Sequence, residues 1–226
     1  MLRAVLFDLD NTLIDFMTMK RASCEAAVSA MISAGVKIDK DEAVRLLFQL
    51  YDQYGYEYNL IFQRFLESIQ KTIDYRILAA GIIAYRKVQQ GFLEPYPQVV
   101  PTLLALKQQG IRIGIVTDAP RLKAWMRLTE LHLQDFFDVV VAHGDVDELK
   151  PSVMPFQRAL DALQLAAADV LMVGDRPDKD IAGAKRLGMK TCFARYGWLY
   201  EPVPKTDADH EIDGIGELLS IIKQVK

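Results

Sequence analysis

The 226-residue sequence has few cysteines, little excess charge and no long apolar run. Its two cysteines, Cys24 and Cys192, are far apart in the chain, which argues against a disulfide framework and favours a reducing compartment such as the cytoplasm. The 27 lysines and arginines against 30 aspartates and glutamates give a formal charge of -3, without the basic excess typical of nucleic-acid-binding proteins. The most apolar interior run, residues 77–85, is much shorter than the roughly 20 residues that a membrane span needs. These scarcities predict a globular cytoplasmic protein without nucleic-acid or membrane partners.

A dinucleotide-binding fingerprint is also missing, because no G-x-G-x-x-G follows the first predicted strand. What the chain does contain is a series of short, continuously apolar runs, as in a parallel sheet that is covered on both faces. The predicted strands span residues 3–9, 111–117, 138–143, 169–175 and 190–195. Helical patterns lie between and after them, at residues 99–110, 120–133, 154–165 and 180–188. This alternation predicts an α/β fold with a doubly wound parallel sheet.

Residues 15–94 interrupt the alternation, because they contain helical patterns and no convincing strand. Apolar residues recur there at intervals of three and four, which is typical of helices that pack into a small bundle. The predicted helices span residues 16–35, 40–55, 59–70 and 74–91. The sequence therefore predicts two domains, an α/β core formed by residues 1–14 and 95–226 and an inserted helical domain formed by residues 15–94.

Polar residues follow four of the predicted strands at the point where each strand ends. Because ligands of open α/β sheets bind at the carboxyl ends of the strands, these residues are expected to share one site. They are Asp8, Asp10 and Thr12 after the first strand, Thr117 and Asp118 after the second, Lys150 after the third, and Asp175 and Asp180 after the fourth. Taken singly, several have simpler explanations: Thr117 and Asp180 could each cap the helix that follows.

The chemistry of this set points to a cation and a phosphate. Asp8 and Asp10 stand two residues apart in extended chain, so their side chains emerge on the same side, roughly 6–7 Å apart at Cα. Carboxylates this close raise one another's pKa unless a cation neutralises them, and oxygen ligands favour Mg²⁺. Thr117 offers a hydroxyl donor and Lys150 a positive charge to a phosphoryl oxygen. A carboxylate in such a site can act as a nucleophile, and a second one as general acid and base.

Four segments together resemble a known family. They are DLDNT at residues 8–12, Thr117 after an apolar strand, Lys150 followed by proline, and GDRPDKD at residues 174–180. In this order they are similar to the four motifs of the haloacid dehalogenase-like hydrolase superfamily, whose core is Rossmann-like. The helical insert is similar to the cap domain that one large subgroup carries after the first motif.

The resemblance implies a role for each matching residue in phosphoryl transfer. Asp8 would be the nucleophile and Asp10 the general acid and base, while Thr117 and Lys150 would hold the transferring phosphoryl group. Asp118 stands where many relatives have asparagine. Its backbone N–H could still serve the phosphoryl group, but a carboxylate near a phosphate is unfavourable unless the side chain turns away.

The resemblance also implies a Mg²⁺ site. Its ligands would be Asp8, the backbone carbonyl of Asp10, and Asp175, with Asp180 holding the metal shell or orienting Lys150. Asp178 competes with Asp180 for the last role, but the spacing of the family's motif favours Asp180. The second aspartate, Asp10, favours phosphoryl transfer over dehalogenation, because the dehalogenases of the family lack it.

The resulting prediction is a Mg²⁺-dependent phosphatase that hydrolyses a small phosphorylated metabolite through an aspartyl-phosphate intermediate. Phosphoglycolate, triose phosphates and sugar phosphates are the implied substrate classes, and the protein is expected to be a monomer or a homodimer. One alternative is a phosphomutase of the β-phosphoglucomutase type. Another is a regulatory, phosphate-binding protein of the same fold without turnover, in which phosphorylated Asp8 would persist.

Overall fold

The computed structural model describes residues 2–225, with side chains as far as Lys223, and in this part of the chain six strands form one sheet. All adjacent strands are parallel, in the order β3-β2-β1-β4-β5-β6. The strands are β1 (Ala4–Phe7), β2 (Arg112–Pro120), β3 (Val139–His143), β4 (Val170–Gly174), β5 (Lys190–Ala194) and β6 (His210–Ile212). The predicted doubly wound parallel sheet is thereby confirmed.

The central strand of the sheet is β1, whose four residues are all buried. It pairs with β2 on one side and with β4 on the other, so that Phe7 lies opposite both Ile115 and Val173. The chain runs outward from β1 through β2 and β3, and then returns to place β4 on the other side of β1. The strand order thus reverses between β1 and β4, which is where open α/β sheets bind their ligands, beyond the carboxyl ends of the strands.

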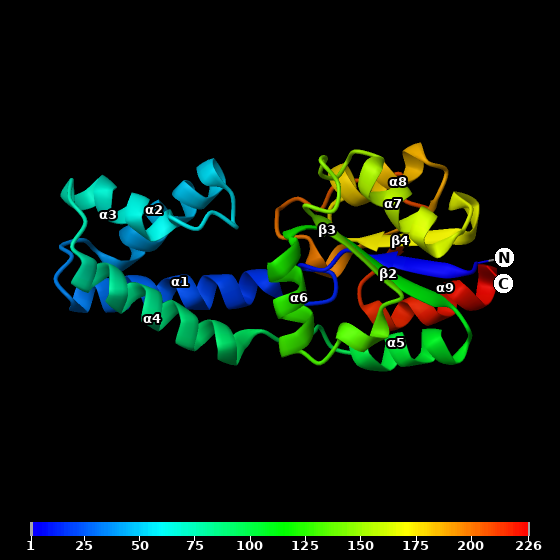
Figure 1. Cartoon of the computed structure of the whole chain (residues 1–226), viewed down its shortest axis with the longest axis horizontal. Coiled ribbons are helices and arrows are strands. Elements are labelled where there is room, and N and C mark those ends of the chain that lie inside the picture. Colours follow the sequence, from blue (N-terminus) through cyan, green and yellow to red (C-terminus); the bar gives the residue numbers. More distant parts are fainter. Residues whose placement is uncertain (1, 226) are drawn as a thin grey trace. The chain divides into compact units, whose positions relative to one another are not determined.

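Helices cover both faces of this sheet (Figure 1). α7 (Met154–Leu163) and α8 (Ala182–Arg186) lie on one face, and α5 (Val99–Gln108) and α9 (Leu218–Val225) lie on the other. α6 (Arg121–Glu130) connects β2 to β3 and packs against both. Because the inner strands β1 and β4 are covered on both faces, their side chains are apolar on both faces, which explains the continuous apolar runs in the sequence.

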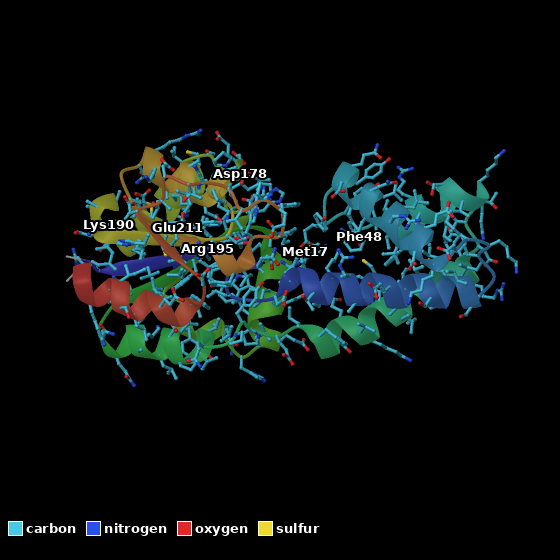
Figure 2. The ribbon with its side chains drawn as sticks, turned by 180° about the vertical axis from the view of Figure 1, so that it is seen from behind. Met17, Phe48, Asp178, Lys190, Arg195 and Glu211 are labelled. Atoms are coloured by element: carbon cyan, nitrogen blue, oxygen red, sulfur yellow. The ribbon has the colours of Figure 1, made fainter. Side chains whose placement is uncertain are left out.

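The sixth strand is absent from the sequence prediction. It contains only three residues, and its central residue, Glu211, is exposed. Figure 2 labels Glu211 and Arg195, whose charged groups are 3.7 Å apart at the edge formed by β5 and β6. Short 3-10 turns lie at Gln134–Phe136, Ala167–Asp169, Arg195–Gly197 and Ile215–Glu217.

Phe16–Leu93 forms a second compact unit, separate from the α/β unit that contains the sheet. It consists of α1 (Phe16–Ser33), α2 (Lys40–Tyr54), α3 (Ile61–Gln70) and α4 (Tyr75–Phe92). Two of these helices begin at an aspartate, Asp39 or Asp74, whose carboxylate accepts hydrogen bonds from backbone N–H groups of the first turn. Apolar residues of all four helices form one core. Among the described residues, no helix is both long and apolar enough to cross a membrane.

Candidate active site

Three carboxylates meet at the carboxyl ends of β1 and β4. Asp8 directly follows β1 and its N–H donates to the Val173 carbonyl of β4 (2.9 Å). Asp175 directly follows β4, and Asp180 lies in a π-helical turn, Pro177–Ile181, that precedes α8. One carboxylate oxygen from each of the three lies within 4.8 Å of the others, and all three residues are buried. The structure therefore brings together three of the residues that the sequence assigned to a metal site.

Lys150 lies within this acidic group. Its Nζ donates three hydrogen bonds, to Asp8 Oδ1 (2.7 Å), Asp180 Oδ1 (2.7 Å) and the Val116 carbonyl (2.9 Å). Burial by itself lowers the pKa of Lys150, but the nearby carboxylates of Asp180, Asp8 and Asp118 raise it above its ordinary value. The ammonium is thus held in its charged form although its side chain is only 2% exposed.

One ammonium does not neutralise three carboxylates. Burial raises the pKa of Asp175 well above its ordinary value, and the negative charges of Asp8 and Asp180 raise it further. Burial also raises the pKa of Asp180 to about 7, although Lys150 opposes the shift. Both shifts disfavour the ionised carboxylates, and a further cation beside them would oppose the shifts. Buried carboxylate oxygens without histidine or cysteine among them suit Mg²⁺.

A close approach of two loops fixes the position of Asp175. Thr12 Oγ1 donates to Asp175 Oδ1 (3.1 Å) and accepts from the Asp175 N–H (3.1 Å). Tyr196 in turn donates its hydroxyl to the Thr12 carbonyl (2.7 Å). A Cβ on Gly197 would lie 1.8 Å from the carbonyl oxygen of Asn11 and 2.7 Å from Asp175 Cβ, so only glycine fits there.

Tyr196 and Gly197 are not among the site residues predicted from the sequence. The available signal was a glycine two residues beyond the last predicted strand, since glycine often marks a place where backbone approaches a ligand site closely.

Gly174, the last residue of β4, meets a similar constraint. A Cβ there would lie 2.2 Å from Asp180 Oδ2, the oxygen that accepts the Arg176 N–H (3.0 Å). Asp180 therefore uses one oxygen for the backbone and the other for Lys150, which fixes its carboxylate against the strand end. The sequence predicted that Asp180 opens the helix of residues 180–188, but α8 begins at Ala182, after the π-helical turn. Asp180 caps no helix here, because both oxygens have these other partners.

Asp10 lies outside the group of three carboxylates. Its Oδ2 accepts a hydrogen bond from Arg127 Nη1 (2.6 Å), and both side chains are largely buried. Arg127 belongs to α6, on the helix face that also buries Ala124 and Leu128. Arg127 is not among the predicted site residues, because an arginine within a helical pattern is usually exposed. The available signal was its position three residues after Ala124 and next to Leu128, on the apolar face of the helix.

Thr117 and Asp118, which lie in the last four residues of β2, have different partners. Thr117 is buried, and its Oγ1 accepts the N–H of Ala119 (3.1 Å). It does not cap α6, whose first residues receive no side-chain hydrogen bond from the N-cap Pro120. Asp118 accepts the Lys150 backbone N–H through Oδ1 (3.0 Å) and the Lys179 ammonium through Oδ2 (2.8 Å). Lys179 was not predicted as a site residue.

Asp178 lies apart from these contacts. Its carboxylate pairs with Arg176 (2.7 and 3.0 Å), and its side chain is 58% exposed. The Arg176 guanidinium, through this hydrogen bond, lowers the pKa of Asp178. Of the two acids in GDRPDKD that competed in the sequence, Asp180 is therefore the one that contacts Lys150.

Comparison with known proteins identifies the family of the chain. A family model described as haloacid dehalogenase-like hydrolase matches residues 5–194. The chain is 34% identical over 226 residues to a glyceraldehyde 3-phosphate phosphatase of Methanocaldococcus jannaschii, covering 100% of this chain and 99% of that protein. It is 32% identical over 232 residues to the pyrophosphatase PpaX of Bacillus cereus, covering 99% and 98%. A crystal structure of a HAD phosphatase from Thermococcus onnurineus superposes with a TM-score of 0.72 at 28% identity, covering 98% of both chains.

Proposed function

The chain belongs to the haloacid dehalogenase-like hydrolase family, and we propose that within this family it is a Mg²⁺-dependent phosphatase for a small phosphorylated metabolite. The observation that carries the proposal is the position of Asp8, buried at the end of the central strand within reach of Lys150, Asp175 and Asp180. A carboxylate fixed at this point, beside a buried ammonium, suits attack on a phosphoryl group.

The residues of the site then have distinct roles in the reaction. The Asp8 carboxylate attacks phosphorus and forms an aspartyl-phosphate, while the ester oxygen leaves with a proton from Asp10. Asp10 next removes a proton from the water that hydrolyses the aspartyl-phosphate, which releases inorganic phosphate and restores Asp8. Thr117 and Lys150 stabilise the phosphoryl oxygens during both steps.

The donor set fits a magnesium ion. Asp8 and Asp175, with the backbone carbonyl of Asp10, would hold it, and Asp180 would complete the surrounding shell while it orients Lys150. The raised pKa of Asp175 supports this assignment, since burial and neighbouring charge leave that carboxylate in need of a cation. When bound, Mg²⁺ supplies positive charge that neutralises the carboxylates and the phosphoryl oxygens.

Arg127 fixes the position of the Asp10 carboxylate. The ion pair holds the carboxylate away from the Lys150 cluster, so that Asp10 does not add a fourth negative charge to that cluster. We therefore include Arg127 as the residue that positions the general acid and base.

Triose phosphates are the leading substrate class in this proposal, because a relative that matches the whole chain is named a glyceraldehyde 3-phosphate phosphatase. The helical unit would serve as a cap that closes over the site and restricts it to small molecules. The proposal includes action in the cytoplasm as a monomer or homodimer. A phosphomutase would use the same nucleophile but return the phosphoryl group to a sugar.

Release of inorganic phosphate tests the proposal directly. We would assay glyceraldehyde 3-phosphate, phosphoglycolate, a hexose phosphate and pyrophosphate, with Mg²⁺ and with EDTA. Asp8→Asn should lower the rate by at least about a thousandfold, because the amide is a very poor nucleophile. Asp178→Asn is the matched control, since this exposed aspartate lies outside the cluster, and its rate should stay within about twofold of the wild type. Absence of release from every compound of the panel would refute the phosphatase, and isomerisation of a hexose phosphate without release would establish the mutase instead.

A further inference from the structure

The carboxylate of Asp118 joins three loops of the site. Asp118 lies near the carboxyl end of β2. Its Oδ1 accepts a hydrogen bond from the backbone N–H of Lys150 in the loop after β3, and its Oδ2 accepts one from Nζ of Lys179 in the turn after β4. The distances are 3.0 Å and 2.8 Å. Both side chains are partly buried, with exposed fractions of 21% for Asp118 and 34% for Lys179.

This carboxylate stands at an unfavourable place for a negative charge. It directly follows Thr117 and holds the backbone of Lys150, the two residues that would contact the phosphoryl oxygens. A phosphate group near a bare carboxylate is repelled, and the repulsion is strongest where water is partly excluded. An ammonium at 2.8 Å cancels that charge.

The two carboxylate oxygens of Asp118 thus make different interactions. Oδ1 needs only to be a hydrogen-bond acceptor, and an asparagine oxygen would hold the Lys150 backbone equally well. Oδ2 carries the additional charge, and its partner is the Lys179 ammonium. A cation at Lys179 is therefore needed because residue 118 is an aspartate; an asparagine at that position would not need one.

We propose that Asp118 and Lys179 form a charge-compensated pair, in which Asp118 positions the Lys150 loop and Lys179 cancels the charge that would repel the phosphoryl group. The inference rests on the proposed function, because it concerns the phosphoryl subsite of that reaction. Both side chains act by positioning and charge, and neither side chain is assigned a contact with the reacting atoms.

A double-mutant cycle separates charge compensation from a mere structural clip. Lys179→Met leaves the carboxylate bare, so kcat/KM and the affinity for inorganic phosphate should each fall about tenfold. Adding Asp118→Asn removes the bare charge, and the double variant should recover to within about threefold of Asp118→Asn alone. A structural clip predicts no recovery, because the double variant restores no contact to Lys179.

Lys185→Met is the matched control, since Lys185 pairs with Asp207 outside the site (3.3 Å). Its kcat/KM and phosphate affinity should stay within about twofold of the wild type. Unfolding of every variant is followed by tryptophan fluorescence, so that loss of fold is not mistaken for loss of binding.

Phosphate affinity is measured by calorimetry on wild type and variants, independently of turnover. If the wild type hydrolyses no ester but binds inorganic phosphate, the phosphatase proposal fails, and the affinities of the variants still decide the role of the pair. A double variant as weak as Lys179→Met, or a Lys179→Met variant that binds phosphate as tightly as the wild type, would overturn the inference. A wild type that neither turns over nor binds phosphate would overturn both.

Discussion

Replacing Lys150 by methionine removes an ammonium that donates hydrogen bonds of 2.7 Å to both Asp8 and Asp180. Methionine keeps most of the side chain's length and its apolar packing. It removes the positive charge and all three hydrogen bonds, including the one to the Val116 carbonyl. Two buried carboxylates are then left without their cation, so the α/β unit should lose stability.

The loss can be estimated from the burial of the pair. Because the Lys150 side chain is only 2% exposed, solvent screens its charge little. Removing one partner of a buried ion pair costs about 3–5 kcal/mol. For a chain of this length each kcal/mol shifts the unfolding midpoint by about 2–4 °C, so the expected drop is about 6–20 °C. Domains of ordinary stability, about 5–15 kcal/mol, remain folded after such a loss at room temperature in most cases.

Fluorescence reports the right part of the molecule. Both tryptophans of the chain, Trp125 and Trp198, belong to the α/β unit, so thermal unfolding followed by their emission has no contribution from the helical unit. The measurement is made in EDTA. Lys185→Met is again the control, because Lys185 pairs with Asp207, whose side chain is 81% exposed. Loss of this exposed ion pair should change the unfolding midpoint by less than about 2 °C.

A second substitution identifies the cause. Asp180→Asn in the Lys150→Met background removes one of the two unpaired charges and should recover part of the lost midpoint. If Lys150→Met unfolded within about 2 °C of the wild type, the carboxylates would not depend on this ammonium and the reasoning would be wrong. If single and double variants had the same lowered midpoint, the loss would come from packing and not from charge.

Three further outcomes follow from the same geometry. Gly197→Ala should weaken Mg²⁺ binding in calorimetry at least about tenfold, because the new Cβ would lie 1.8 Å from a carbonyl oxygen of the site. Gly216→Ala is the control and should leave Mg²⁺ affinity unchanged, because its Cβ would lie 3.7 Å from the nearest atom; equal affinities of the two variants would show that the loop at Gly197 moves at little cost. Arg127→Met should lower kcat about tenfold with a smaller change in KM, because Asp10 loses the guanidinium that holds its carboxylate. Arg127→Lys should recover part of the lost kcat, and an unchanged kcat in Arg127→Met would remove Arg127 from the mechanism. Burial raises the pKa of Asp175 in the folded protein above its unfolded value, so ionisation of this carboxylate destabilises the metal-free protein as the pH rises, and the gain in unfolding midpoint on adding MgCl₂ should increase with pH. A gain that is constant or falls with pH would contradict the assignment of this carboxylate to the metal.

The family and the core of the site were predictable because their signals are local. Apolar runs without polar interruption predicted five strands, and the structure confirms the parallel sheet they form. The motifs at residues 8–12 and 174–180 predicted the haloacid dehalogenase-like family, which the match over residues 5–194 confirms. The short edge strand β6 has no such signal, because it has only three residues and the central one is exposed. Its strand conformation depends on pairing with β5, which the sequence does not reveal.

The charged partners of the site were unpredictable for a different reason. Arg127 reaches Asp10 across 117 positions of sequence, and Lys179 reaches Asp118 across 61. Each basic residue lies in a segment whose composition is ordinary for a solvated surface. Only the fold brings it to a carboxylate, so a single sequence carries no information on the pairing.

These pairings distribute the charge of the site. Asp10 has Arg127 and Asp118 has Lys179, so each of these acids has its own cation. Asp8, Asp175 and Asp180 instead share Lys150, which leaves two negative charges uncompensated when all three are ionised, the charge that one divalent cation supplies. The excess is therefore concentrated at the ends of β1 and β4, and this explains why burial and mutual repulsion raise the pKa values of Asp175 and Asp180 there. It follows that the three cations should differ in what their removal disturbs: metal-free stability for Lys150, phosphate affinity for Lys179 and the proton-transfer step for Arg127.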